Sequence, residues 1–166
     1  MVHANGPQAV AQAIEAGCDS IEHGYFMGAD NLHRLAETRI AWVPTLIPMA
    51  ALADDPSLSA HQQDTARRTL DHQLAQVRQA HQLGVKVVLG TDAGSVGVDH
   101  GLAVAREIAL LQETGLTVAA VVQAASGLAA RLLGLKDGHR LAPGCAASFI
   151  VVPGAPHQLS ENLKNI

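Results

Sequence analysis

The sequence predicts a single α/β domain with a parallel sheet. Its length of 166 residues suits one unit with a real core. Hydrophobic residues make up 48% of the chain but aromatic residues only 2%, so the interior is built from aliphatic side chains. Short segments typical of strands alternate with longer segments typical of helices along the whole chain. This alternation favours a parallel sheet covered by helices over a β-sandwich.

The first two strand signals are short and end at polar residues. Residues 2–4 have the pattern of the end of a strand, and Pro7 suits the first turn of the helix that follows. Apolar residues then recur at helical spacing until Gly17, which favours a helix end. A second strand is predicted over residues 20–24, and a second helix over residues 29–38.

The middle of the chain contains the strongest helix signal. Residues 40–46 are predicted as a strand, and residues 48–59, which contain Pro48 and two adjacent aspartates, as a loop. A long helix is predicted over residues 59–83. Its start carries the capping-box pair Ser59 and Gln62, and Gly84 follows its end.

The last third repeats the pattern once more. A strand is predicted over residues 85–89, followed by helices over residues 102–113 and 117–133. Val104, Ile108 and Leu111 form the apolar stripe of the first helix, and that of the second includes Val121 and Val122. The tail predicts a turn and a final strand over residues 148–152.

Three of the four predicted strands end at or just before a side chain that can bind metal. His3 stands at the end of the first strand signal, His23 at the end of the second, and Asp92 just beyond the fourth, in the sequence VVLGTDAG. Parallel strands place their carboxyl ends at one edge of a sheet, where the chemistry of such folds is usually found. Imidazole and carboxylate groups are ligands that zinc prefers. A bound cation would also make a carboxylate at the end of a buried strand tolerable.

Each of these residues also has a structural interpretation. His3 and His23 could be histidines held by hydrogen bonds at strand ends, and Asp92 could cap the helix that follows it. Glu22 is expected to point away from the ligands, since side chains alternate along a strand. The remaining histidines, apart from His100, lie in polar or helical contexts with no partner spacing.

Charge and composition exclude several classes of protein. The net charge is -4 and no basic cluster is longer than the Arg67-Arg68 pair, which argues against nucleic-acid binding. No run of about 18 apolar residues predicts a membrane helix, and the start MVHANG lacks the features of an export signal. The compartment stays open, with the cytoplasm favoured. Cys18 and Cys145 lack the spacing of a zinc site and predict two unpaired thiols.

The motifs VHANG, DSIEHG, VPTL, GVKVVLGTDAG, TVAAVVQAASGLAARLLGL and HRLAPGCAASFIVV occur in this order along nearly the whole chain. Together they resemble the carboxyl-terminal half of a metal-dependent amidohydrolase of the imidazolonepropionase-like and prolidase-like branch. The resemblance implies strands five to eight of a (β/α)₈ TIM barrel over residues 1–140. It also implies that residues 141–166 begin the return to a small β-sandwich.

The resemblance implies a role for each candidate. His3 and His23 would bind a divalent metal, most often zinc, with one or two ions in the complete enzyme. Asp92 would bind metal and act as the catalytic base on a water molecule. His100, in the sequence VDHG, is similar to a position that lies beside the substrate. The substrate would be a small amide, cyclic amide or dipeptide.

The chain also departs from the family pattern. Family members carry a His-x-His pair on the first strand and a bridging lysine or acid on the fourth. No His-x-His occurs in these 166 residues. A full barrel needs about 250 residues, so the chain has the size of half an enzyme. Two functions therefore remain open, namely part of a metal-dependent hydrolase or a non-catalytic half-barrel domain. In either case the open sheet edge predicts an oligomer or a missing amino-terminal half.

Overall fold

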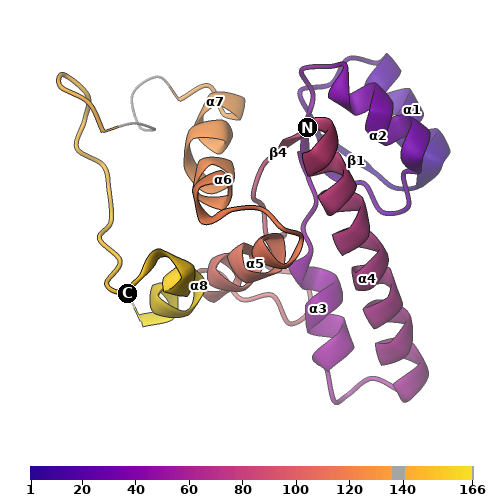
Figure 1. The fold of residues 1–166 in the computed structure, drawn as a ribbon. Coiled ribbons are helices and arrows are strands. Elements are labelled where there is room, and N and C mark those ends of the chain that lie inside the picture. The colour runs from indigo at the N-terminus through magenta and orange to yellow at the C-terminus, as the bar shows by residue number, and fades with distance from the viewer. Residues whose placement is uncertain (136–140, 166) are drawn as a thin grey trace.

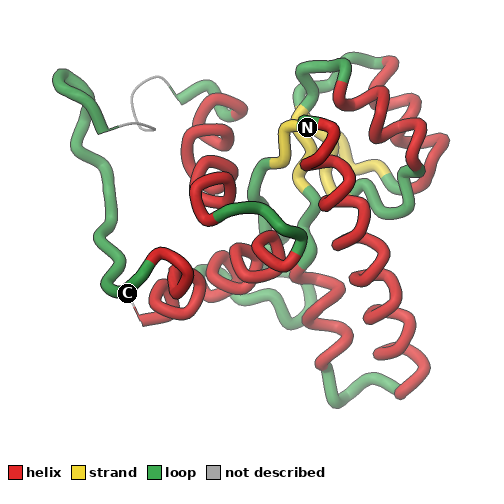
Figure 2. The backbone as a smooth tube through the Cα atoms, in the orientation of Figure 1, coloured by secondary structure: helices red, strands yellow, loops and turns green. Residues whose placement is uncertain are grey.

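The computed structural model describes residues 1–135 and 141–165. Four parallel strands form its sheet in the order of the sequence: β1 (Val2–Ala4), β2 (Ser20–His23), β3 (Ala41–Val43) and β4 (Lys86–Val87). Figure 2 shows these strands together at the centre of the upper part of the molecule, surrounded by helices. The predicted α/β class and parallel sheet are confirmed. The first strand has the predicted bounds, and the other three are shorter than the sequence pattern suggested.

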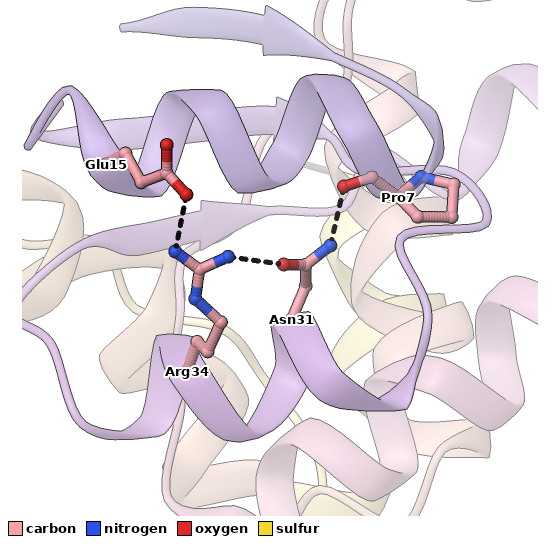
Figure 3. Close-up of polar contacts among 4 residues, drawn as sticks. All are labelled: Pro7, Glu15, Asn31 and Arg34. Carbon is pink, nitrogen blue, oxygen red and sulfur yellow. Dashed lines mark hydrogen bonds and ion pairs between the residues drawn. The ribbon is translucent and has the colours of Figure 1, made fainter.

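The first two helices lie side by side against the sheet. Helix α1 (Gly6–Glu15) begins with proline in its first turn, and α2 (Ala29–Ala36) follows β2. Figure 3 shows how polar contacts join them. The amide of Asn31 donates to the carbonyl oxygen of Pro7 at 2.8 Å, and Arg34 bridges Asn31 and Glu15. Asn31 is buried, so its bond to the start of α1 fixes the spacing of the two helices.

Helix α4 (Ala60–Leu83) confirms the strongest prediction. The Ser59 hydroxyl accepts from the backbone N–H of Gln62, and the Gln62 side chain accepts from the backbone N–H of Ser59, completing the capping box. The helix ends at Gly84, whose φ of 80° suits glycine. In Figure 1, α4 crosses the molecule from the level of the strands to its lower end.

Helix α3 (Ile47–Asp54) corrects the prediction of a loop over residues 48–59. Pro48 stands in the first turn of the helix, where proline needs no amide partner and its fixed φ is favourable. Most of the helix is buried, because Ile47, Ala50 and Ala51 pack into the core. A helix buried on nearly all sides has no amphipathic period, which is why the pattern was missed.

The two faces of the sheet have different neighbours. Ile21 and Trp42 point into the main core, which they share with side chains of α1, α2 and α4. Ala41, Val43 and Val88 form a second cluster on the other face, against Leu128, Ala129 and Leu132. Strand alternation explains this division, since Trp42 stands between Ala41 and Val43.

Helix α5 (Leu102–Glu113) forms where a helix was predicted, and Ile108 and Leu111 of the predicted stripe are buried. Val104 is 38% exposed, whereas Ala103 and Glu107 are buried. The helix predicted over residues 117–133 is interrupted by a π-helical turn, η1 (Ala124–Leu128), which lies between α6 (Val118–Gln123) and α7 (Ala129–Leu132). Val122, predicted as buried, is 43% exposed.

The carboxyl-terminal segment does not form the strand predicted over residues 148–152. Phe149, Ile150 and Val151 are all more than 60% exposed, and no described strand runs beside them to pair with. The chain then forms three short helical turns, η2 (Pro156–Gln158), α8 (Leu159–Asn162) and η3 (Leu163–Asn165). Leu159 and Leu163 pack on the main core, and Figure 1 shows α8 beside α5. The predicted domain boundary at residues 140 and 141 adjoins residues 136–140, which lie outside the described residues.

Among the described helices, none combines the length and the apolar character needed to cross a membrane.

Candidate active site

The carboxyl ends of β1, β2 and β4 bring three predicted site residues to the same hollow. The rings of His3 and His23 are 4.5 Å apart between centroids, at an interplanar angle of 65°. Asp92, from the loop after β4, lines with both histidines a pocket of about 390 Å³ and a neighbouring one of about 380 Å³. The strand-end argument from the sequence therefore placed these three residues correctly relative to one another.

The backbone at this edge of the sheet adopts an unusual conformation. His23, Thr45 and Asp92 have φ values of 66°, 47° and 53°, in the left-handed region that residues other than glycine rarely adopt. Phe26 is the fourth such residue among those described. Left-handed backbone at a β-branched residue such as Thr45 is especially unfavourable, and such strain gathers at functional sites. Three of the four strand ends share this feature.

His23 is held from two directions. Its ring nitrogen Nδ1 lies 2.7 Å from the hydroxyl of Thr45. Its carbonyl oxygen accepts from the indole N–H of Trp42 at 2.9 Å and from the amide of Gln73 at 3.4 Å. Gly24 follows with a φ of 64°, and a Cβ atom there would collide with the Trp42 indole. This close packing explains why glycine follows the histidine in the sequence EHG.

Burial lowers the pKa of His23 below its ordinary value, and the neighbouring His3 lowers it further. The carboxylates of Asp92 and Glu22 act in the opposite direction but do not reverse the shift. The imidazole is therefore neutral at neutral pH. Neutral imidazole is the form that binds a metal ion.

His3 and Asp92 are more exposed than His23. The amide of Asn5 donates to Nε2 of His3 at 3.3 Å, and Asn5 also accepts from the backbone N–H of Tyr25 at 2.9 Å. The carboxylate of Asp92 accepts from the Ser95 hydroxyl at 2.7 Å. Each of the two side chains is thus held by a hydrogen bond with a residue close to it in the sequence.

The donor set of two imidazoles and one carboxylate fits an ion of the zinc class. The described residues contain no group of three or more His, Cys, Asp or Glu side chains drawn together closely enough to hold an ion. His3, His23 and Asp92 line a common pocket without forming one coordination shell. A metal site here needs either a movement of these side chains or further ligands.

His100 and Glu22 differ from expectation. His100 lines a separate hollow with residues of α5 and the carboxyl-terminal turns, and that hollow includes none of His3, His23 and Asp92.

Glu22 was expected to point away from His23, yet both line the same pocket. The left-handed backbone of His23 departs from the extended conformation in which side chains alternate along a strand. Glu22 accepts from the Ser20 hydroxyl at 2.6 Å.

Two residues support the site, of which sequence reasoning missed Glu107 and expected Thr45 only to form structural hydrogen bonds. Thr45 contacts His23, and Glu107 of α5 is completely buried near the end of β3. A signal for Glu107 exists in the sequence. It lies four residues from both Ala103 and Leu111 on the same face of α5, so a charged residue interrupts an apolar stripe.

Comparison with known proteins agrees with this geometry. The sequence model of the Amidohydrolase family matches residues 1–165. The chain belongs to the amidohydrolase family. This amidohydrolase chain is 37% identical over 139 residues to an uncharacterized protein of Mycobacterium tuberculosis strain H37Rv, a match that covers 80% of this chain and 36% of that protein.

Two solved structures show the same arrangement of elements. A Xaa-Pro dipeptidase with methionine bound in its active site superposes with a TM-score of 0.84 and 30% identity, over 98% of this amidohydrolase chain and 41% of the dipeptidase. A putative prolidase from Bifidobacterium longum gives a TM-score of 0.81 and 25% identity, over 97% of this chain and 42% of the prolidase. The chain thus spans about two fifths of the length of each of these proteins.

Proposed function

We propose that this amidohydrolase chain supplies half of the active site of a metal-dependent hydrolase that cleaves carbon–nitrogen bonds. The substrates would be small amides, cyclic amides or dipeptides. Family membership supports the reaction class, and the similarity to a Xaa-Pro dipeptidase supports the dipeptide substrate. On this proposal the four strands correspond to strands five to eight of a TIM barrel. The ligands that would complete the site belong to the other half of the barrel.

The chain's own residues have distinct roles in this reaction. His3 and His23 would hold the ion, zinc by preference, through neutral imidazole nitrogens. Asp92 would hold the ion and also accept a proton from the attacking water and deliver it to the leaving nitrogen. If bound at this position, a divalent ion would lower the pKa of water and polarise the substrate carbonyl. His100 remains a proposed substrate contact, although its hollow is separate from that of the other three residues.

One observation carries the proposal. His3 in β1, His23 at the end of β2 and Asp92 in the loop after β4 line the same pocket, and two of the three have left-handed backbone. Residues other than glycine rarely adopt this conformation, and such strain gathers at functional sites. Surface histidines and helix caps form without such strain.

The test is the zinc content of the purified 166-residue chain, measured by elemental analysis and by titration calorimetry. We expect zinc to bind to the wild-type chain and binding to be lost in the His23→Ala variant. His33→Ala provides the control, because His33 is an exposed histidine of α2 outside the hollow. Equal zinc binding by all three proteins would contradict the proposal. No binding by any of them would favour the alternative, a non-catalytic half-barrel domain.

A further inference from the structure

Glu107 is a buried carboxylate without a cation. Its side chain is completely inaccessible to solvent, and none of the ion pairs among the described residues includes it. Its two oxygens accept instead from the backbone N–H groups of Leu46 and Ile47, at 3.0 and 2.8 Å. Burying a carboxylate is unfavourable, and two backbone hydrogen bonds offset only part of this cost. Because burying Glu107 is unfavourable, we expect its carboxylate to have a role in the structure.

The two N–H groups belong to the turn between β3 and α3. They follow Thr45 directly and form the amino-terminal end of α3, where N–H groups have no partner within the helix. A carboxylate is favourable at this end of a helix. Glu107 therefore fixes the chain immediately after Thr45. It holds in place the turn in which Thr45 has its unfavourable φ of 47°.

Thr45 connects this turn to the site through its contact with His23. Its hydroxyl lies 2.7 Å from Nδ1 of His23, and its carbonyl oxygen accepts from the Tyr25 hydroxyl at 3.3 Å. When Nδ1 of a neutral histidine carries the proton and donates to a neighbour, the lone pair for a ligand is on Nε2. The contact with Thr45 engages Nδ1 of His23, so Nε2 is the ring nitrogen left for a ligand when the proton is on Nδ1.

We infer that Glu107 is a positioning residue, whose carboxylate fixes the turn after β3 and, through Thr45, presents Nε2 of His23 to a ligand. The inference deepens the proposed function, on which the identity of the ligand rests. It links α5, which follows the fourth strand, to a side chain at the end of the second. No direct contact joins Glu107 to His23, so the effect depends on the turn.

A second contact makes the inference testable. The amide of Gln73, on α4, donates to the carbonyl oxygens of both Pro44 and His23. It holds the backbone before Thr45 independently of Glu107. Replacing Glu107 should therefore alter the end of the turn while the strand and the core keep their packing.

The experiment uses the metal-free 166-residue chain labelled with ¹⁵N-histidine at pH 8, where the imidazoles are neutral. Long-range proton–nitrogen correlation spectra distinguish the two tautomers of His23. We expect wild-type His23 to carry its proton almost entirely on Nδ1. In Glu107→Gln the amide can accept from only one of the two N–H groups, so we expect a mixture of tautomers.

Thr45→Val tests the contact between Thr45 and His23. Valine has nearly the same shape and the same β-branch but no hydroxyl, so the tautomer preference of His23 should be lost. Glu113→Gln is the matched control, because Glu113 is an exposed glutamate on the same helix. It should leave the His23 signals unchanged. If Glu107→Gln does not fold, Glu107→Asp is the second variant. Aspartate keeps the carboxylate but is one methylene shorter, so its oxygens lie farther from the two N–H groups, and we expect a His23 spectrum between those of the wild type and Glu107→Gln.

A folded Glu107 variant with a wild-type His23 spectrum would overturn the inference, and so would a wild-type spectrum in Thr45→Val. Zinc affinity gives a separate readout. Loss of a residue that orients a ligand weakens metal binding by about 10-fold or more, and we expect this loss in Glu107→Gln. A wild-type chain that binds no zinc would contradict the proposed function alone, since the tautomer measurement needs no metal.

Discussion

At the scale of single residues, Asp92 combines an exposed side chain with a strained backbone. Its φ is 53°, and its only side-chain hydrogen bond among the described residues is with Ser95. Left-handed backbone is unfavourable by about 1 kcal/mol for residues other than glycine. Stability therefore favours glycine at this position, whereas the proposed function needs the carboxylate.

Asp92→Gly should separate these two demands. Glycine relieves the backbone strain, so we expect the free energy of unfolding to stay the same or to rise by up to about 1 kcal/mol. Zinc binding should be lost, because the carboxylate is gone. Urea unfolding followed by circular dichroism, together with calorimetry, checks both effects. A clear loss of stability would show that the carboxylate serves mainly as a structural cap.

Glu107 makes the stability of the chain dependent on pH. Complete burial raises its pKa to about 7, and the backbone N–H groups of Leu46 and Ile47 limit the rise. An unfolded chain loses this proton near its ordinary value of 4.5, whereas the folded chain keeps it until about pH 7. The folded state thus binds more protons in this range. Its stability must fall as the pH rises from about 4.5 to 7 and level off above.

The Glu107→Gln variant should lack this contribution. We expect the stability of the wild-type chain relative to Glu107→Gln to decrease by roughly 3 kcal/mol between pH 4.5 and 7.5. Unfolding curves at several pH values measure the difference, and subtraction removes the effects of the histidines and of other carboxylates. A constant difference between the two proteins would mean that Glu107 titrates normally.

At the scale of elements, α4 depends on its first turn. Ser59→Ala removes the side-chain acceptor for the N–H of Gln62 and opens the capping box. We expect a loss of about 1 kcal/mol in the free energy of unfolding. Thr65→Ala, on the exposed surface of the same helix, should be neutral or slightly stabilising because alanine has the higher helix propensity. Equal effects of the two substitutions in thermal unfolding would contradict the assigned cap.

Local signals predicted the elements that depend on local physics. The strands, α4 and its cap, and the convergence of His3, His23 and Asp92 followed from periodicity, capping residues and the parallel arrangement. The strand over residues 148–152 was wrong because a strand needs a partner, and the sequence does not say whether one is near. Helix α3 was missed because it is buried on nearly all sides and so shows no amphipathic period.

The supporting residues of the site were less predictable. Thr45 and Glu107 are far apart in the sequence, and their contacts depend on how α5 packs against the turn after β3. The left-handed backbone of His23, Thr45 and Asp92 also has no local signal, because none of the three is glycine. Only the tertiary structure shows that these features belong together.

At the scale of the whole molecule, the chain exposes surfaces that favour association. Within the described residues, β1 and β4 each pair on one side only. The apolar residues Phe149, Ile150 and Val151 are exposed in a row. Open sheet edges and contiguous apolar surface both favour contacts between chains. The oligomer expected from the sequence stays a prediction, and the open sheet edges and exposed apolar residues support it.

We expect light scattering to show self-association that increases with protein concentration. Combined substitution of Phe149→Ser, Ile150→Thr and Val151→Thr should reduce it. Val122→Thr, which changes one exposed apolar residue of α6, should not. A wild-type chain that remains monomeric over the whole concentration range would refute the expectation.

Trp42 gives the molecule an optical probe of its own site. It is the only tryptophan in the sequence, it is completely buried, and its indole N–H donates to the carbonyl oxygen of His23. All indole emission therefore comes from a side chain that is hydrogen-bonded to the backbone of a proposed metal ligand. A change in the hydrogen bond or in the packing around His23 alters the wavelength or intensity of this emission. Fluorescence can thus follow both ligand binding and unfolding without any label.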